Sequence, residues 1–204
     1  MKITSIKSQV KHSGRYSIFI DGKYSFGLSD RTLLEKKLFV GQELDATEAG
    51  KLKKAATDDK LYSLVLRYVA MRPRSEWEIK TYLKNKHSPT SLTKILLNKL
   101  SNIGLVDDLA FARSWVNSRR LLKTLSRRKI FQELLIKHVE EEVINQVLAE
   151  DETDELAVLR ELVAKKRSQS RYKDKLKLMQ YLSSKGFTYD NIKSVVNEEN
   201  NFKQ

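Results

Sequence analysis

The sequence predicts a mainly α-helical protein that begins with a small β-rich module. Five of the seven glycines lie within the first 50 residues, where aromatic and β-branched residues alternate with turn residues. After residue 60 the chain carries long stretches of helix-forming residues, and its apolar positions recur at intervals of about 48 residues. These observations predict three tandem three-helix repeats, arranged in an extended curved array, after the β-rich module.

The amino-acid composition indicates a basic globular protein and excludes functions that need cysteine. The 204 residues include 39 Lys and Arg against 26 Asp and Glu, giving a net charge of +13 that favours an anionic partner. Hydrophobic residues make up 40% of the chain, which is typical of a globular protein able to bury a core. The absence of cysteine excludes disulfides, thiol catalysis and cysteine-ligated zinc.

The sequence contains no apolar run long enough to cross a membrane. Its first residues, MKITSIKSQV, contain no apolar core of a secretory signal. We therefore expect a cytoplasmic protein with no membrane partner.

Residues 1–59 are predicted to form the β-rich module. Asp21-Gly22 lies between two strand-like runs of RYSIFIDGKYSFGL, and Asp-Gly favours a type I′ hairpin because both turn residues need a positive φ. Residues 3–10 add a third predicted strand. Ser29 is expected to open a short helix, and residues 46–56 a second helix.

Nine helices are predicted after this module, beginning near residues 60, 75, 89, 108, 126, 140, 154, 173 and 188. Ser75 and Glu78 have the spacing of a capping box. Ser88-Pro89 is expected to supply an N-cap and the first helical residue, and Asp107 another N-cap.

The helices recur in threes. Second helices align at shifts of 51 and 48 residues, first helices at 47, and the third helices of the last two repeats at 48. The aligned apolar positions are Ile79, Ile130 and Leu178; Leu83, Leu134 and Leu182; Ile144 and Ile192; and Val147 and Val195. The predicted repeats are residues 60–106, 107–152 and 153–204, and the alternative is an ordinary helical bundle with accidental similarities.

Basic residues follow the same period. The stretches 60–75, 109–132 and 162–173 hold four, seven and five basic residues and no acid, whereas 140–155 holds eight carboxylates and no basic residue. Stacked repeats would align the basic stretches in a stripe. Such a stripe could follow a phosphate backbone, dock on an acidic protein groove, or only keep the protein soluble.

No pattern of residues indicates catalysis or metal binding. His12, His87 and His138 lack cysteine partners and an HExxH arrangement, and the chain has no Walker A loop. Helix capping accounts for Asp107 in the acidic pair 107–108. Trp77 and Trp115 are expected to anchor helices rather than stack on bases. The sequence thus predicts a binding protein without metal or cofactor.

Three segments resemble the RecX family of regulators of the RecA recombinase. They are LVLRYVAMRPRSEWEIKTYL, LLNKLSNIGLVDDLAFARSWVNSR and RRKIFQELLIKH, which carry the family motifs at 72–75, 78–79 and 104–119. The N-terminal RYSIFIDGKYSFGLSDRTL is similar to the β-rich extension of longer members. The chain departs from the family where glycine commonly follows the second helices, because His87 and His138 stand there and only Gly186 conforms. A further glycine, before the second helix of repeat two, is replaced within 123–125.

This resemblance implies a monomeric, non-enzymatic regulator of homologous recombination, DNA repair and the SOS response. It would bind in the groove of a RecA filament on single-stranded DNA and restrain recombination and ATP turnover, the ATP belonging to the partner. Nucleic acid is an expected partner as the single-stranded DNA within the filament; whether free DNA is also bound, even weakly, is left open by the sequence.

The predicted contact residues are the basic side chains of the three stretches. They are Arg72, Arg74, Arg113, Arg119, Arg120, Lys123, Arg127, Arg128, Lys129, Lys166 and Arg167. The alternative function is a stand-alone DNA-binding protein, because basic three-helix units resemble helix-turn-helix modules. A nuclease would need carboxylates beside the basic face, whereas the acids lie elsewhere in the sequence.

Overall fold

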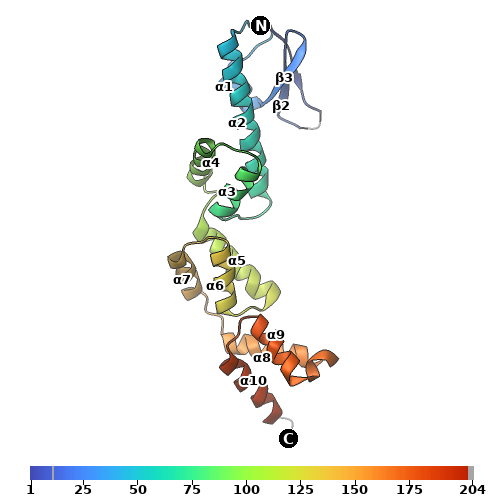
Figure 1. The fold of residues 1–204 in the computed structure, drawn as a ribbon, viewed down its shortest axis with the longest axis vertical. Helices are drawn as coiled ribbons and strands as arrows, with labels where there is room; N and C mark the ends of the chain where they lie inside the picture. Colours follow the sequence, from blue (N-terminus) through green and yellow to red (C-terminus); the bar gives the residue numbers. More distant parts are fainter. Residues whose placement is uncertain (11, 202–204) are drawn as a thin grey trace. The chain divides into compact units, whose positions relative to one another are not determined.

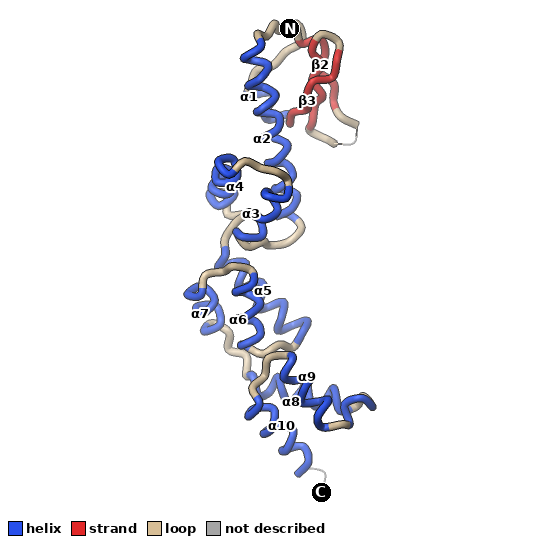
Figure 2. Tube along the Cα trace, viewed as in Figure 1, coloured by secondary structure: helices blue, strands red, loops and turns tan. Residues whose placement is uncertain are grey.

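A computed structural model describes residues 1–10 and 12–201, with side chains through residue 198. The chain divides into two compact units. The first comprises Met1–Arg72 and Ile79–Ile103, and the second comprises Pro73–Glu78 and Gly104–Gln204. Figures 1 and 2 show strands only in the N-terminal part, with helices in the rest of the described chain.

The first unit opens with a three-stranded antiparallel sheet in the order β1-β2-β3. Its strands are β1 (Ile3–Ser8), β2 (Arg15–Ile20) and β3 (Lys23–Ser29). The predicted hairpin is confirmed: Asp21 and Gly22 have φ values of 48° and 78°, as a type I′ turn requires. The inner face of the sheet buries Ile3, Ile18 and Leu28 completely.

Two helices follow the sheet. Ser29 caps α1 (Asp30–Glu35) through its side chain, as predicted, and Asp45 with Glu48 forms a capping box at the start of α2 (Ala46–Ala70). The predicted separate helices at 46–56 and from 60 are wrong, because α2 runs through both. No glycine or proline interrupts α2 beyond its first turns.

The polar residues in the middle of α2 have internal partners. Asp59 is buried, and it accepts hydrogen bonds from the Ser29 backbone N–H at 2.9 Å and the Thr32 hydroxyl at 2.8 Å. Arg15 of β2 pairs with the same carboxylate at 3.0 Å. These contacts fix the sheet against α2, which explains why a polar stretch does not end the helix.

The last helices of this unit are α3 (Glu76–Asn85), of which Ile79 onward belongs here, and α4 (Thr90–Asn102). The predicted N-cap at Ser88 is wrong by one residue, because Pro89 occupies the N-cap position with no side-chain cap. Proline fixes its own φ, and its ψ of 146° keeps it outside the helix.

The second unit holds two helix triplets, each with its own core. The first triplet is α5 (Asp108–Lys123), α6 (Arg127–Ile136) and α7 (Glu141–Ala149). The second is α8 (Glu155–Arg167), α9 (Lys175–Ser184) and α10 (Tyr189–Asn201), with a short 3₁₀ turn, η1 (Ser170–Lys173), before α9. Asp107 caps α5, as predicted.

The aligned apolar positions confirm the repeat. Six side chains of the second helices have 0% exposure, namely Ile79, Leu83, Ile130, Leu134, Leu178 and Leu182. In the third helices of the last two repeats, Ile144, Val147, Ile192 and Val195 are at most 3% exposed. The mainly α class with tandem three-helix domains after a β-rich module is therefore confirmed. Among the described helices none combines the length and apolarity of a membrane span.

Candidate functional site

Arg120 of α5 is a buried structural residue. Its side chain is 11% exposed and donates from Nε and Nη2 to Asp151 Oδ2, at 2.9 and 2.6 Å. Its Nη1 donates to the Leu125 carbonyl at 2.6 Å. Asp151, 8% exposed, also accepts from Thr153. The guanidinium therefore ties the loops after α5 and α7 together, and each of its three nitrogens donates to an acceptor within the chain.

Arg119 is also committed to an internal contact. It pairs with Glu133 of α6 and lies over the Trp115 ring, 3.9 Å from its centroid. Trp115 Nε1 donates to the same carboxylate at 2.9 Å. Trp115 thus joins α5 to α6, which confirms its predicted role as an anchor between helices.

Several other predicted contact residues have partners within the chain. Arg113 forms a solvent-exposed, two-pronged pair with Glu150 at 2.8 and 2.9 Å, and this hydrogen bond lowers the pKa of Glu150. Arg127 Nη2 donates to the Asp151 carbonyl at 2.6 Å. In the last repeat, Arg167 donates to the Lys173 carbonyl at 3.1 Å, and Lys166 lies 5.0 Å from the Tyr181 ring centroid.

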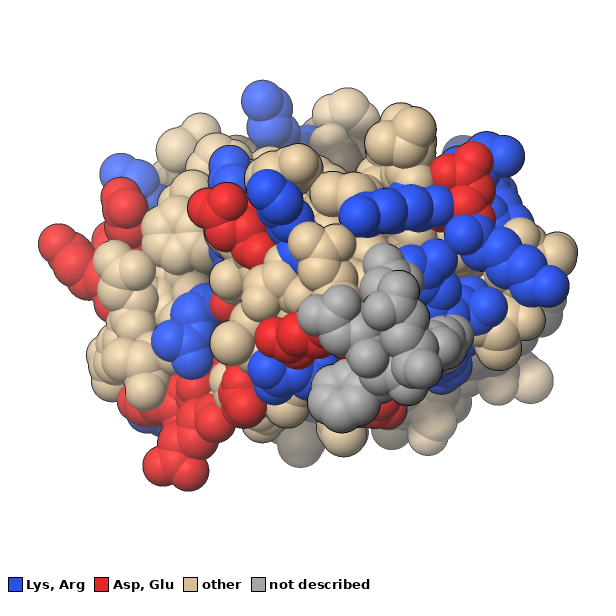
Figure 3. Space-filling model, turned by 90° about the horizontal axis from the view of Figure 1, so that it is seen from below, with Lys and Arg blue, Asp and Glu red and all other residues tan. Residues whose placement is uncertain are grey.

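The acidic stretch 140–155 is therefore not remote from the basic residues of repeat two, and the expectation that it lies elsewhere is wrong for this repeat. Its carboxylates Glu150 and Asp151 pair with α5, and Glu155 accepts from the Arg127 backbone N–H at 2.7 Å. The third helix of the repeat packs along the first, so the loop that follows it returns to the basic residues. On the end of the molecule drawn in Figure 3, acidic side chains likewise stand beside basic ones.

Two predicted cations of repeat two stay available. Lys123 and Arg128 are exposed, and within the described residues neither side chain has a carboxylate partner. Leu121 and Leu122, at the end of α5, are 83% and 78% exposed. This surface, residues 121–123 with Arg128, combines apolar area with unneutralised charge. Of the remaining predicted residues, Arg72 is exposed, and Arg74 and Lys129 are partly buried.

A junction within the second unit holds residues 73–78 against the turn after α6. The Ser75 hydroxyl donates to the Lys137 carbonyl at 3.0 Å and accepts from the Glu78 N–H, the first half of the predicted capping box. The Glu78 carboxylate, 6% exposed, pairs with Lys137 Nζ at 2.7 Å. Trp77 stacks on His138 with ring centroids 4.6 Å apart, which is the predicted anchoring role.

A second junction repeats this arrangement between the last two repeats. The Ser126 backbone N–H donates to the Lys185 carbonyl at 3.1 Å, so the start of α6 meets the turn after α9. Ser126 occupies the position equivalent to Ser75, and both are at most 1% exposed. This recurring polar contact was not predicted; the aligned serines and lysines were its signal in the sequence.

The junctions explain why the turn after each second helix differs. His87, His138 and Gly186 all have positive φ values, of 58°, 54° and 92°. A Cβ at Gly186 would stand 2.6 Å from Lys129 Cβ and 3.1 Å from its backbone N, so this contact requires glycine. His138 faces the Trp77 ring instead, which leaves room for a side chain. Thr124 takes a left-handed conformation with φ of 50° at the end of α5.

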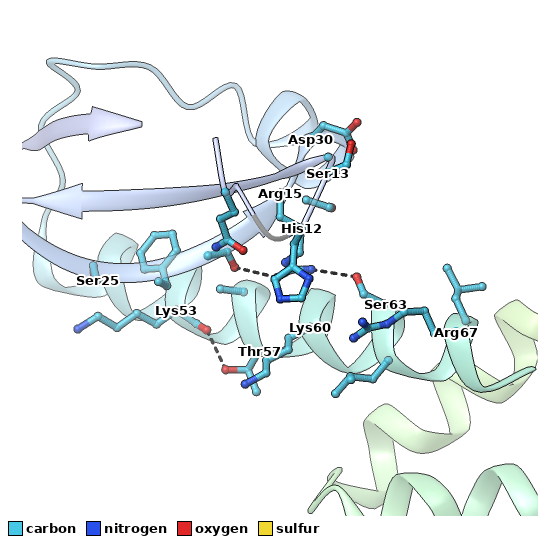
Figure 4. A pocket seen from close by; sticks show the side chains of 18 of the residues that line it. His12, Ser13, Arg15, Ser25, Asp30, Lys53, Thr57, Lys60, Ser63 and Arg67 are labelled. Atoms are coloured by element: carbon cyan, nitrogen blue, oxygen red, sulfur yellow. Dashed lines mark hydrogen bonds between the residues drawn. The ribbon is translucent and has the colours of Figure 1, made fainter. Parts of the chain in front are cut away.

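The first unit contains a groove of 1090 Å³ between α2 and the edge of the sheet. Figure 4 shows Lys53, Thr57, Lys60, Ser63 and Arg67 along α2, with His12, Ser13 and Arg15 approaching from the sheet side. Arg15 donates to the Ser63 hydroxyl at 3.0 Å and is neutralised by Asp59.

Metal chemistry has no support in the described part of the chain. No group of three or more histidine, cysteine, aspartate or glutamate side chains there is placed to hold a metal ion. Burial raises the pKa of Asp108, partly offset by a hydrogen bond from the Glu76 N–H. This bond joins the start of α5 to the start of α3, so Asp108 has a structural role at the junction.

Three family models match the chain. They are the regulatory protein RecX N-terminal domain over residues 1–45, the RecX second three-helix domain over 107–148 and the RecX third three-helix domain over 152–196. The chain belongs to the RecX family. The matched segments correspond to the β-rich module and to repeats two and three.

Relatives and solved structures agree with this assignment. A regulatory protein RecX of Listeria monocytogenes is 32% identical over 203 residues, covering 97% of this chain and 76% of the relative. One from Lactobacillus johnsonii is 35% identical over 153 residues, and the match spans 56% of its length. A crystal structure of regulatory protein RecX has a TM-score of 0.69 and 29% identity, covering 96% of this chain and 98% of its own. The structure of RecX from Lactobacillus salivarius, 23% identical with a TM-score of 0.59 over 71% of this chain, shares the fold.

Proposed function

We propose that this RecX-family chain binds filaments of the RecA recombinase and restrains DNA strand exchange and ATP turnover, without catalysing a reaction itself. The observation that carries the proposal is membership of a family of regulatory proteins, matched over the N-terminal module and two of the repeats. The junction between the last two repeats supports it, because a partner would meet a preformed surface.

The contact surface that we propose in repeat two is centred on residues 121–123 and Arg128. An ion pair already made within the chain has little attraction left for a partner, whereas Lys123 and Arg128 keep their full charge. The exposed leucines beside them add apolar area to a charged rim, as in many protein interfaces. Lys129, Lys166, Arg72 and Arg74 remain further proposed contacts.

This division changes how the proposal is tested. Charge reversal at Arg119 or Arg120 would place a carboxylate beside Glu133 or Asp151 and destabilise the fold, so lost activity would not report on binding. Reversal at Lys123 and Arg128 breaks no ion pair among the residues that the structure describes. A matched control is the reversal of Arg31 and Lys36, which are also one arginine and one lysine, both exposed.

The experiment compares K123E/R128E with R31E/K36E in retention on RecA filaments assembled on single-stranded DNA, and in inhibition of strand exchange. We expect K123E/R128E to lose both, with a wild-type circular dichroism spectrum, and the control to keep both. Wild-type retention and inhibition by K123E/R128E would overturn the proposed surface. Failure of the wild-type protein to bind filaments, while it binds bare duplex in a sequence-specific way, would favour the stand-alone DNA-binding function.

A further inference from the structure

The groove in the first unit holds a line of cations without partners. Lys53, Lys60 and Arg67 are seven residues apart, so they fall on one side of α2 with about 10 Å between successive positions. All three are exposed, and in the described chain no carboxylate pairs with them. A rigid helix thus presents three positive charges in a row to one open space.

The other charges around the groove do not cancel this row. Arg15 and Asp59 neutralise each other, and Asp59 faces the sheet rather than the groove. Among the described residues that line the groove, Asp30 is the single carboxylate, and its Oδ1 accepts from the Arg31 backbone N–H. Three unpaired cations against one carboxylate leave a net positive groove, which favours an anionic ligand of repeating charge.

The wall opposite the cations is aromatic and polar. Tyr24 of β3 lines the groove and is 61% exposed, and its ring is held edge-on against Phe19 at 6.0 Å between centroids. On the same wall Ser25 adds a hydroxyl and Gln9 an amide. A ligand here would contact charge on one side and a flat apolar ring on the other.

We propose that this groove binds single-stranded nucleic acid, with its phosphates along Lys53, Lys60 and Arg67 and a base against Tyr24. A basic groove with an exposed aromatic ring matches the way single strands are held, since the backbone follows the charges and unstacked bases cover the ring. A duplex keeps its base faces stacked and offers nothing to Tyr24. The inference does not rest on the RecA proposal, because it concerns the chain alone with a nucleic acid.

The test uses the full chain and fluorescein-labelled oligo(dT), with binding followed by anisotropy over a range of salt concentrations. The groove variant K53Q/K60Q is compared with K51Q/K54Q, which changes two exposed lysines of the same helix outside the groove and has the same net charge. Each phosphate contact on a single strand contributes about 0.7 to the slope of log affinity against log salt. We expect K53Q/K60Q to lower the slope by about 1.4 and K51Q/K54Q to leave it unchanged.

Further arms identify the ligand. Tyr24→Ala should weaken binding several-fold without changing the salt slope, and Tyr24→Phe should restore it, because stacking needs the ring and not the hydroxyl. Equal slopes for the two lysine pairs, or no binding of oligo(dT) by the wild-type protein at low salt, would overturn the proposal. Tighter binding of a labelled oligoglutamate peptide or of duplex DNA than of oligo(dT), lost in K53Q/K60Q, would show that the groove serves another polyanion.

Discussion

Repeat two and the groove of α2 are both rich in basic residues, yet they use them in opposite ways. In repeat two, Arg113, Arg119 and Arg120 pair with carboxylates that lie 37, 14 and 31 residues further along the chain. Along α2, Lys53, Lys60 and Arg67 face an open groove with no such partner in the described residues. Density of basic residues in a sequence is therefore a poor measure of available positive charge.

The difference has a physical origin. In repeat two the third helix packs along the first, so the carboxylates in the loop after α7 meet the arginines of α5. Within residues 1–10 and 12–201, no returning segment places carboxylates beside Lys53, Lys60 and Arg67 on the exposed side of α2. Arg119 and Arg120 of repeat two contribute to folding, whereas Lys53, Lys60 and Arg67 in the groove are left for a ligand.

The largest expected effect on stability comes from breaking the buried ion pair between Arg120 and Asp151. Arg120→Ala would leave Asp151 buried without its guanidinium and the Leu125 carbonyl without a donor, at a cost of about 4 kcal/mol in the free energy of unfolding. Lys60→Ala, at an exposed position, should change it by less than about 0.5 kcal/mol. Urea denaturation measures both free energies of unfolding. If the two variants lost similar stability, the basic residues of repeat two and of the α2 groove would not differ in their contribution to folding.

The junction between repeats should be nearly as sensitive. Gly186→Ala forces a side chain into a left-handed position and against the backbone of Lys129, which we expect to cost about 2 to 3 kcal/mol. His138→Ala removes only a ring stacked on Trp77, with a cost of about 1 kcal/mol. Thermal unfolding of both variants measures these costs. An unchanged unfolding temperature for Gly186→Ala would contradict the close packing of Gly186 against Lys129.

The buried carboxylate of repeat two should also make stability depend on acid. Burial by itself raises the pKa of Asp151, but hydrogen bonds from Thr153 and Arg120 outweigh burial and hold it below 3.8. A carboxyl group with a lowered folded-state pKa stabilises the fold above its unfolded value, and that stability is lost as pH falls through the folded-state pKa.

Asp151→Asn should therefore cost about 2 kcal/mol at neutral pH and lose less stability than the wild type below about pH 4. Asp108 has a raised pKa, so its contribution to the free energy of unfolding changes with pH in the opposite direction. Because Asp108 is present in both proteins, its contribution cancels when the two stabilities are subtracted. Parallel acid titrations of unfolding would show this convergence, and a constant difference at every pH would argue against an ionised Asp151.

The smallest effect is expected at the exposed pair. Arg113→Gln removes a two-pronged contact with Glu150, but both groups are solvated and their attraction is screened by water and salt. The unfolding midpoint should not change measurably. A clear loss would show that exposed pairs also hold repeat two together and would sharpen its contrast with the α2 groove.

The sequence by itself determined the fold class, the hairpin at Asp21-Gly22, the caps at Ser29 and Asp107, and the aligned apolar positions of the repeats. These features depend on neighbours within a few residues or on a periodic pattern, and both can be recognised in the sequence without the structure. The motifs at 72–75 and 104–119 likewise sufficed to indicate the family.

Only the tertiary structure decided which cations are available. Whether Arg120 or Lys60 is neutralised depends on a carboxylate that folding places beside it, and no local pattern records that distance. The same holds for the turns after the second helices, since Gly186 is required by the approach of Lys129 and His138 is permitted by Trp77. Charge and shape at a surface are set by segments far apart in the chain, so their consequences emerge only when those segments pack.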